Sequence, residues 1–241
     1  MSARREDAVR RLVVALDTSD RAAILALARD LSGRVGMFKV GLEAFTAHGP
    51  ALVGEVRALG VPVFLDLKLH DIPNTVERAA RNLARLGVAV MTTHAGGGRA
   101  MLEAAARGAA AGTPEGAARP LVLAVTVLTS LDDAALDELG IPGGAAARVA
   151  SWAELARAAG CDGVVCSPRE TAALRARLGP EFVLLTPGIR PAGGDVGDQK
   201  RVATPRDAVA AGATYIVVGR PITAAPDPAA AAEAILAELL D

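Results

Sequence analysis

The chain has 241 residues, of which 51% are hydrophobic, and its formal net charge at pH 7 is −1, so it can bury one large core and has no basic surface suited to nucleic acid or an anionic membrane. No apolar run approaches the length of a membrane-spanning helix, and Glu6 and Asp7 stand where a signal peptide would have its apolar segment. We therefore expect a soluble, cytoplasmic protein without nucleic-acid or membrane partners.

Short apolar segments alternate with helical patterns along the whole chain. We expect strands at residues 12–17, 37–41, 61–68, 88–94, 120–128, 163–167, 182–186 and 215–220. A helix is expected after each strand. The first should be capped within Thr18-Ser19-Asp20, and the helical region at 131–159 should be broken at 140–144.

Alternating strands and helices predict a parallel sheet, and eight such units in 241 residues match a closed (β/α)8 barrel, the TIM barrel. A doubly wound open sheet is the alternative, but the Gly-x-Gly-x-x-Gly pattern of a dinucleotide site does not follow the first strand. Because no Pro/Gly-rich linker or shift in composition divides the chain, we expect residues 1–241 to form a single domain.

The two cysteines, Cys161 and Cys166, are too few for a disulfide framework. No His/Cys cluster accompanies them, so we expect buried, reduced thiols rather than a zinc site.

Polar residues recur in the later part of the predicted strands or just after them. They are Asp17, Lys39, Asp66, Lys68, His94, Thr129, Ser167, Thr186 and Arg220. In a parallel barrel these positions converge at one mouth, where active sites form. This convergence favours a functional site over a solvated surface.

The third predicted strand has the most informative pattern. Leu65, Leu67 and Leu69 share one face of an extended chain, and Asp66 and Lys68 share the other. Taken alone, this pattern is equally typical of a solvated salt bridge. Opposite charges beside a dry surface are costly unless they are paired, so they are more often kept for chemistry than for stability.

Two predicted loops suit a phosphate group. The segment after the seventh strand, from Thr186 to Arg201, is long, polar and glycine-rich, and the eighth strand ends in Gly219-Arg220. Loops after strands seven and eight commonly bind phosphate in this architecture. An ordinary surface loop followed by a helix start remains the alternative.

Several segments resemble the orotidine 5′-phosphate decarboxylase family over almost the whole chain. The most specific is Phe-Leu-Asp-Leu-Lys-Leu-His-Asp-Ile-Pro-Asn-Thr at 64–75, supported by 38–41, 124–130, 185–191 and 197–199. The resemblance implies decarboxylation of orotidine 5′-phosphate to UMP and CO2, the last step of UMP synthesis, by a homodimer that needs no metal or cofactor.

The resemblance also implies residue roles. Lys68 would protonate C6 of the pyrimidine, and Asp66 would hold Lys68 beside the substrate carboxylate. Lys39 would bind the ribose and, with Asp66, Lys68 and Asp71, form an alternating chain of charges. Asp71 and Thr75 would enter the partner subunit's site. Asp17 would contact a ribose hydroxyl, and Thr129 or Ser130 would contact the pyrimidine edge. Ile72 and Pro187 are further implied substrate contacts. The residues implied at or near the phosphate are Arg190, Gln199, Gly219 and Arg220.

Two other functions stay open. Magnesium-dependent sugar-phosphate decarboxylases of the same barrel type, such as 3-keto-L-gulonate 6-phosphate decarboxylase, share the Asp-x-Lys-x-x-Asp pattern. A catalytically silent nucleotide-binding barrel is the other possibility. We interpret His94 as a hydrogen-bonded wall residue or a dimer contact rather than a catalyst, and assign no role to His48 or His70.

Overall fold

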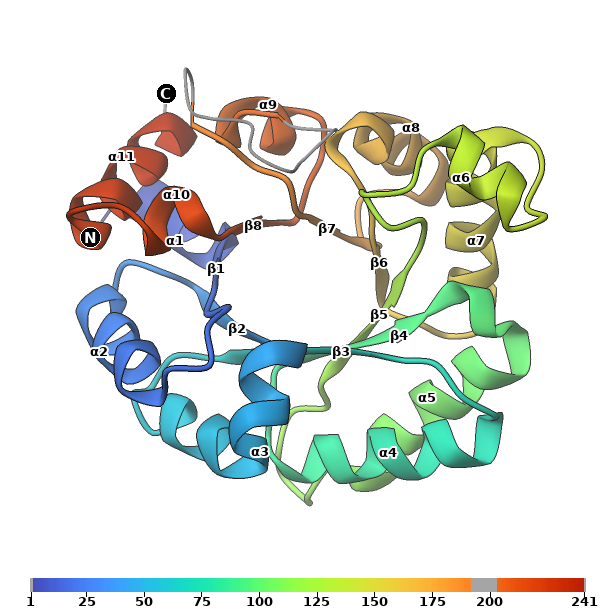
Figure 1. The fold of residues 1–241 in the computed structure, drawn as a ribbon, viewed down its shortest axis with the longest axis horizontal. Coiled ribbons are helices and arrows are strands. Elements are labelled where there is room, and N and C mark those ends of the chain that lie inside the picture. Colours follow the sequence, from blue (N-terminus) through green and yellow to red (C-terminus); the bar gives the residue numbers. More distant parts are fainter. Residues whose placement is uncertain (1, 192–202, 241) are drawn as a thin grey trace.

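The structure is a computed structural model that describes residues 2–191 and 203–240. Eight parallel strands close into a barrel in which each strand pairs with the next and β8 pairs with β1 (Figure 1). The strands are β1 Leu12–Ala15, β2 Met37–Gly41, β3 Val63–Leu69, β4 Val90–His94, β5 Leu121–Val125, β6 Gly163–Val165, β7 Val183–Thr186 and β8 Tyr215–Val218. The predicted (β/α)8 barrel is confirmed.

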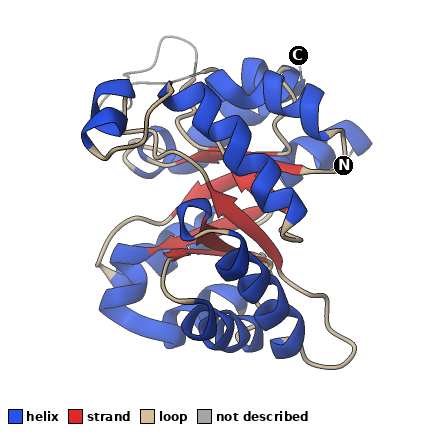
Figure 2. Cartoon of the chain, turned by 90° about the vertical axis from the view of Figure 1, so that its right-hand side faces the viewer, coloured by secondary structure: helices blue, strands red, loops and turns tan. Residues whose placement is uncertain are grey.

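Helices surround the strands, which lie in the middle of the molecule in the side view (Figure 2). They are α1 Ala3–Arg11, α2 Arg21–Leu31, α3 Leu42–Arg57, α4 Pro73–Arg85, α5 Arg99–Gly112, α6 Asp133–Glu138, α7 Gly144–Ala158, α8 Pro168–Leu178, α9 Pro205–Ala210, α10 Arg220–Thr223 and α11 Pro228–Leu240, with a short 3-10 helix η1 at Ala95–Gly97. No helix in the described ranges is both long enough and apolar enough to cross a membrane.

The expected break at 140–144 is confirmed, since it separates α6 from α7. The cap predicted within 18–20 is also confirmed. It lies at the start of α2, where the Asp20 carboxylate accepts hydrogen bonds from the backbone N–H groups of Ala22 and Ala23. Helix α1 was not predicted. Its N-cap is Ser2, and it packs against α11, where Arg5 pairs with Glu233 at 2.8 Å.

Several strands are shorter than predicted. The segment predicted at 120–128 ends its pairing at Val125, and the one predicted at 215–220 ends at Val218. The first and sixth strands likewise end two residues early. Apolar residues continue beyond these strand ends, and Leu16, Val127 and Cys166 are buried in the outer core, so composition alone did not mark where the strand pairing stops.

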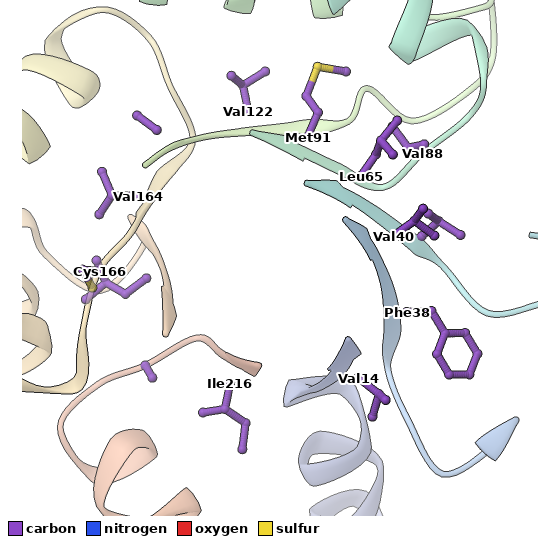
Figure 3. Close-up of a cluster of buried hydrophobic side chains, with 14 of the residues drawn as sticks. Val14, Phe38, Val40, Leu65, Val88, Met91, Val122, Val164, Cys166 and Ile216 are labelled. Atoms are coloured by element: carbon purple, nitrogen blue, oxygen red, sulfur yellow. The ribbon is translucent and has the colours of Figure 1, made fainter. Parts of the chain in front are cut away.

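Successive side chains of each strand point alternately into the barrel and outward to the helices, which produces two apolar layers. Val13, Met37 and Phe64 belong to a cluster inside the barrel, whereas Phe38 and Leu65, one residue further along, belong to the larger core between barrel and helices. Figure 3 shows this outer core, with Phe38 pointing away from the barrel interior. Because Asp66 has the same parity as Phe64, the fold directs the carboxylate inward, as the sequence pattern predicts.

Helices α4 and α5 pack closely because α5 has glycine at its contact points. A Cβ on Gly108 would lie 2.2 Å from the Glu77 carbonyl oxygen, and one on Gly112 would lie 2.1 Å from the Arg81 carbonyl oxygen. Both carbonyls belong to α4, the helix that follows the charged strand β3. This contact therefore helps to fix where β3 leaves the mouth of the barrel.

We predict that Gly108→Ala lowers the free energy of unfolding by about 1–3 kcal/mol, because the methyl group would push α4 away from α5. Gly54→Ala in α3 is the matched control, since a methyl group at that position would have nothing within 4 Å of it. The control should be neutral or stabilising by up to about 1 kcal/mol. Urea unfolding measures both variants, and equal effects would contradict the packing argument.

Candidate active site

A cavity of about 410 Å³ opens at the carboxyl ends of the strands. Its wall combines apolar side chains from inside the barrel, such as Phe64, Leu185 and Val217, with polar residues from the rim. The predicted site residues that line it are Asp17, Lys39, Asp66, Lys68, Thr129, Pro187, Arg190, Gly219 and Arg220. The structure thus brings together residues from six of the eight strand ends.

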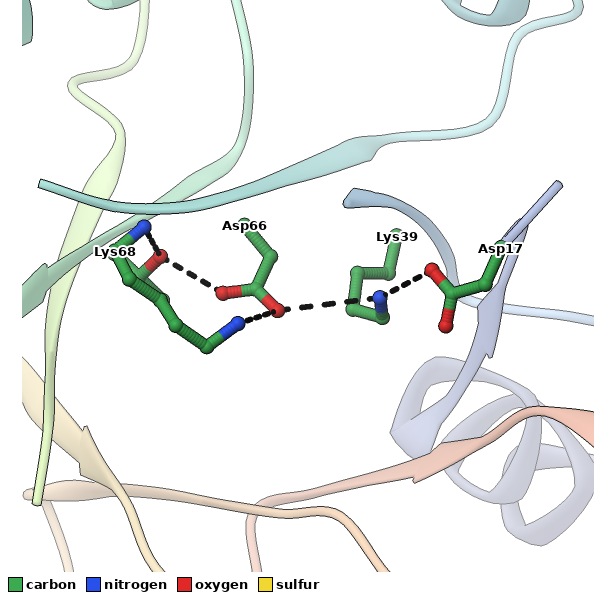
Figure 4. A network of polar contacts seen from close by, with 5 residues as sticks. Asp17, Lys39, Asp66 and Lys68 are labelled. Carbon is green, nitrogen blue, oxygen red and sulfur yellow. Dashed lines mark hydrogen bonds and ion pairs between the residues drawn. The ribbon is translucent and has the colours of Figure 1, made fainter. Parts of the chain in front are cut away.

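Four charged side chains form an alternating row across the strand ends of β1, β2 and β3 (Figure 4). The Lys39 ammonium lies 2.7 Å from Asp17 Oδ1 and 3.9 Å from Asp66 Oδ2. The Lys68 ammonium donates to the same Asp66 Oδ2 at 2.8 Å. Asp66 therefore lies between two cations.

The row is electrically neutral, with two carboxylates and two ammonium groups. Lys39 and Asp66 are each only 9% exposed, so each depends on its neighbours for compensation of charge. The side chain of Lys68 is 33% exposed and lines the cavity, so its ammonium can reach a bound molecule. Such an arrangement can stabilise negative charge that develops in the cavity and can supply a proton.

Lys68 has an unusual backbone conformation. Its φ of 51° makes it the one non-glycine residue with positive φ among the described residues. For a residue with a Cβ this region costs roughly 1–2 kcal/mol. The pairing of β3 with β4 also shifts register between Leu65 and Leu69. Backbone strain at such a place is common at functional sites, where neighbouring contacts hold it.

The rim of the cavity after β7 and β8 carries arginines and glycines. Gly219 and Arg220 follow β8, and Gly188 and Arg190 follow β7. The Arg190 backbone N–H donates to the Ala203 carbonyl at 3.0 Å, next to an isolated bridge between Ile189 and Ala203. These contacts join the two ends of the loop whose middle, 192–202, lies outside the described residues.

The family of the chain follows from comparison with known proteins. A family model described as "Orotidine 5'-phosphate decarboxylase / HUMPS family" matches residues 10–235. The chain belongs to this family. The match spans every strand of the barrel and every residue of the charged row.

Curated relatives named orotidine 5'-phosphate decarboxylase support the assignment to the orotidine 5'-phosphate decarboxylase / HUMPS family. One from Moorella thermoacetica is 59% identical over 234 residues, covering 95% of this chain and 92% of the relative. One from Anaeromyxobacter sp. (strain K) is 57% identical over 229 residues, with coverages of 95% and 98%. The crystal structure of orotidine 5'-phosphate decarboxylase from Lactobacillus acidophilus is 42% identical, has a TM-score of 0.85, and covers 95% of this chain and 98% of its own.

Not all residues implied by the family resemblance reach the cavity. Asp71, Ile72 and Thr75 are exposed and do not line it. Beyond Leu69 the chain turns away from the mouth into α4, and the Asp71 carboxylate accepts a hydrogen bond from the Ile72 N–H at 2.6 Å. Within this chain, Asp71 therefore does not join the row of charges.

Two other implied contacts have different outcomes. Of the alternatives Thr129 and Ser130, Thr129 lines the cavity, whereas Ser130 is exposed and does not. Gln199 lies outside the described residues.

Sequence reasoning assigned no role at the site to Thr92 or Cys166. Thr92 in β4 contacts both Asp66 and Lys68, and its only signal was a hydroxyl inside an otherwise apolar strand. Cys166 lies in the cavity wall. Cys166 is a free cysteine, and burial raises the pKa of its thiol to about 12, so at neutral pH the thiol stays protonated and is a poor nucleophile.

His94 lies at the end of β4 as a structural residue. Its Nδ1 accepts a hydrogen bond from the Gly96 N–H at 3.1 Å, which caps η1. Its ring stacks on His70 at 5.0 Å and meets Trp152 edge-on at 5.9 Å. Burial, with His70 and Lys68 nearby, lowers the pKa of His94. The hydrogen bond expected of His94 is present, but His94 does not line the cavity, and its role as a dimer contact stays a prediction. His70, to which we assigned no role, is its stacking partner.

We predict that His94 contributes to a loss of stability at mildly acidic pH. The unfolded chain takes up its proton near the ordinary pKa of 6.5, whereas the folded protein takes it up only at lower pH. Since the unfolded state then binds more protons, the free energy of unfolding should decrease as the pH falls below about 6.5.

His94→Asn should make that decrease shallower, because asparagine can still accept the Gly96 hydrogen bond but does not titrate. Urea unfolding at a series of pH values measures the slope. His48→Asn is the control for removal of a histidine elsewhere. Identical slopes for wild type and His94→Asn would contradict the prediction.

Proposed function

We propose that this protein decarboxylates orotidine 5′-phosphate to UMP and CO2, the last step of UMP synthesis. The observation that carries the proposal is the Lys68 ammonium, held by Asp66 and lining a cavity that Arg190, Gly219 and Arg220 also line. Membership of the orotidine 5′-phosphate decarboxylase / HUMPS family supports it, as do the names of the relatives.

The proposed chemistry needs no electron sink. When the bond between C6 and the carboxylate carbon breaks, its electron pair stays on C6 and CO2 leaves. The Lys68 ammonium stabilises this developing charge and then transfers a proton to C6, which completes UMP. Lys68 afterwards regains its proton from solvent. Because the ammonium is positioned before the reaction, little reorganisation accompanies the step.

Asp66 serves this chemistry by holding the proton donor. Its Oδ2 accepts from Lys68 at 2.8 Å and lies 3.9 Å from the Lys39 ammonium. We also propose that Asp17 and Lys39 bind the ribose, since both line the cavity between Lys68 and the arginines.

The phosphate is remote from the reacting carbon. We assign it to the Gly219 backbone and the Arg220 guanidinium, with Arg190 nearby, and assign the pyrimidine edge to Thr129 and Pro187. The phosphate contact that the resemblance implies for Gln199 falls outside the described residues. Binding energy from this distant group can be used to orient the pyrimidine at Lys68, so that it raises the rate as well as the affinity.

We propose a homodimer in which Asp71 and Thr75 enter the partner's site, with Ile72 beside them in the chain. All three are exposed at the start of α4, and Ile72 is 67% exposed although it is apolar. A cytoplasmic location and independence of metals and cofactors belong to the same proposal. Among the described residues, no three His, Cys, Asp or Glu side chains are grouped as ligands for a metal ion.

Removal of the proton donor gives the direct test. Lys68→Ala should lower kcat for orotidine 5′-phosphate by at least about 10⁴-fold, because both charge stabilisation and proton donation are lost. UMP should still bind, as calorimetry can show. Lys68→Arg is the matched control: it keeps the charge but gives up a proton far less readily, so it should restore little of the rate. Turnover is followed by pyrimidine ultraviolet absorbance, and near-normal turnover of Lys68→Ala would refute the assignment.

The same assay separates the alternative functions. With orotidine 5′-phosphate and EDTA, the wild-type rate should not change. A rate that EDTA abolishes and Mg²⁺ restores would favour the chemistry of the sugar-phosphate decarboxylases. UMP binding without turnover by the wild type would favour a silent nucleotide-binding barrel.

Mixing two inactive variants tests the shared site. Lys68→Ala and Asp71→Ala subunits should form hybrid dimers with one intact site each. With random exchange, about one quarter of wild-type activity should return. Lys68→Ala mixed with Asp66→Asn is the matched control, because these two changes lie in the same chain's site and no intact site can form. No recovery in the first mixture, with subunit exchange confirmed by mass spectrometry, would contradict the proposed dimer.

A further inference from the structure

The Thr92 hydroxyl connects the two residues at the centre of the charged row. It donates a hydrogen bond to Asp66 Oδ1 at 2.9 Å and accepts one from the Lys68 backbone N–H at 2.9 Å. Thr92 is 1% exposed, so water cannot easily replace either bond. It comes from β4, the strand next to the one that carries Asp66 and Lys68.

The bond to Asp66 determines how the carboxylate is turned. With Oδ1 held by Thr92, Oδ2 faces the Lys68 ammonium at 2.8 Å and the Lys39 ammonium at 3.9 Å. Rotation of the carboxylate would change both distances. The Thr92 hydroxyl therefore keeps Asp66 Oδ2, rather than Oδ1, directed at the ammonium groups of Lys68 and Lys39.

The bond to Lys68 lies where the barrel is irregular. The register between β3 and β4 shifts between Leu65 and Leu69, and Lys68 has a φ of 51°. A residue with a Cβ keeps this conformation only when its surroundings hold it. Thr92 is one such contact, since its oxygen receives the backbone N–H of that residue.

We propose that Thr92 is a positioning residue for the decarboxylation, holding the Asp66 carboxylate and the Lys68 backbone so that the ammonium lies at the reacting carbon. The inference rests on the proposed function. Thr92 does not line the cavity, so its action passes through the two residues that it binds.

The next residue along β4 offers a matched control. Thr93 is also 1% exposed, but its hydroxyl donates to the Leu69 carbonyl at 3.0 Å rather than to the Asp66 carboxylate. Loss of either hydroxyl removes a buried hydrogen bond from β4. Only loss of the Thr92 hydroxyl should disturb the charged row.

The experiment compares Thr92→Val, Thr92→Ala and Thr92→Ser with Thr93→Val. We expect Thr92→Val and Thr92→Ala to lower kcat by about 10²-fold, the usual effect of a small misplacement of a catalytic group, with KM changed only about threefold. Thr92→Ser should stay within about tenfold of wild type, because it keeps the hydroxyl. Thr93→Val should keep kcat within about threefold of wild type. Thermal unfolding and UMP binding establish that each variant is folded.

The pair Thr92→Ala and Thr92→Ser keeps the inference testable even if valine prevents folding, since these two variants differ only in the hydroxyl. Equal kcat values for that pair, or an equal loss in Thr92→Val and Thr93→Val, would overturn it. Failure of the proposed function would give a different result from failure of this inference. The wild type would not turn over orotidine 5′-phosphate, or the Lys68→Ala variant would be active.

Discussion

The site depends on the Asp66 carboxylate, which lies between two ammonium groups and a buried hydroxyl. Its Oδ2 accepts a hydrogen bond from the Lys68 ammonium and lies near the Lys39 ammonium, and its Oδ1 accepts a hydrogen bond from the Thr92 hydroxyl. A buried carboxylate is costly unless charge and hydrogen bonds compensate it, and loss of one partner of such a pair costs about 3–5 kcal/mol. The same compensation fixes the Lys68 ammonium in direction and distance. Stability of the row and positioning of Lys68, the proposed proton donor, are thus two effects of one set of contacts.

The barrel supplies these contacts through strand register. Ala15 of β1 pairs with Lys39 of β2, and Gly41 of β2 pairs with Asp66 of β3, so the three strands present their charged side chains in sequence around the mouth. Below them, inward residues such as Phe64 fill the barrel and keep the base of the cavity apolar. The loops after β7 and β8, to which we assign the phosphate, line the same cavity through Gly188, Arg190, Gly219 and Arg220. In the proposed function, phosphate binding there orients the pyrimidine at Lys68.

Much of this was predictable from the chain because period-two alternation and strand–helix alternation are local signals. They placed Asp66 and Lys68 on the inward face and located the mouth at the strand ends. Thr92 was not predictable, because its role depends on how β4 registers against β3, and a hydroxyl in an apolar strand has many ordinary uses. The positive φ of Lys68 likewise arises from a register shift that regular alternation does not reveal. The exposure of Asp71 follows from the turn into α4, which the motif alone does not describe.

A crystal structure with bound UMP tests the central claim most directly. The account predicts that C6 of the pyrimidine lies within about 3.5 Å of the Lys68 ammonium, the separation of a reactive contact. It also predicts that Asp66 still holds that ammonium and that the phosphate binds at Gly219 and Arg220. A nucleotide bound in the reverse orientation, or a Lys68 side chain turned away from the pyrimidine toward solvent, would contradict it.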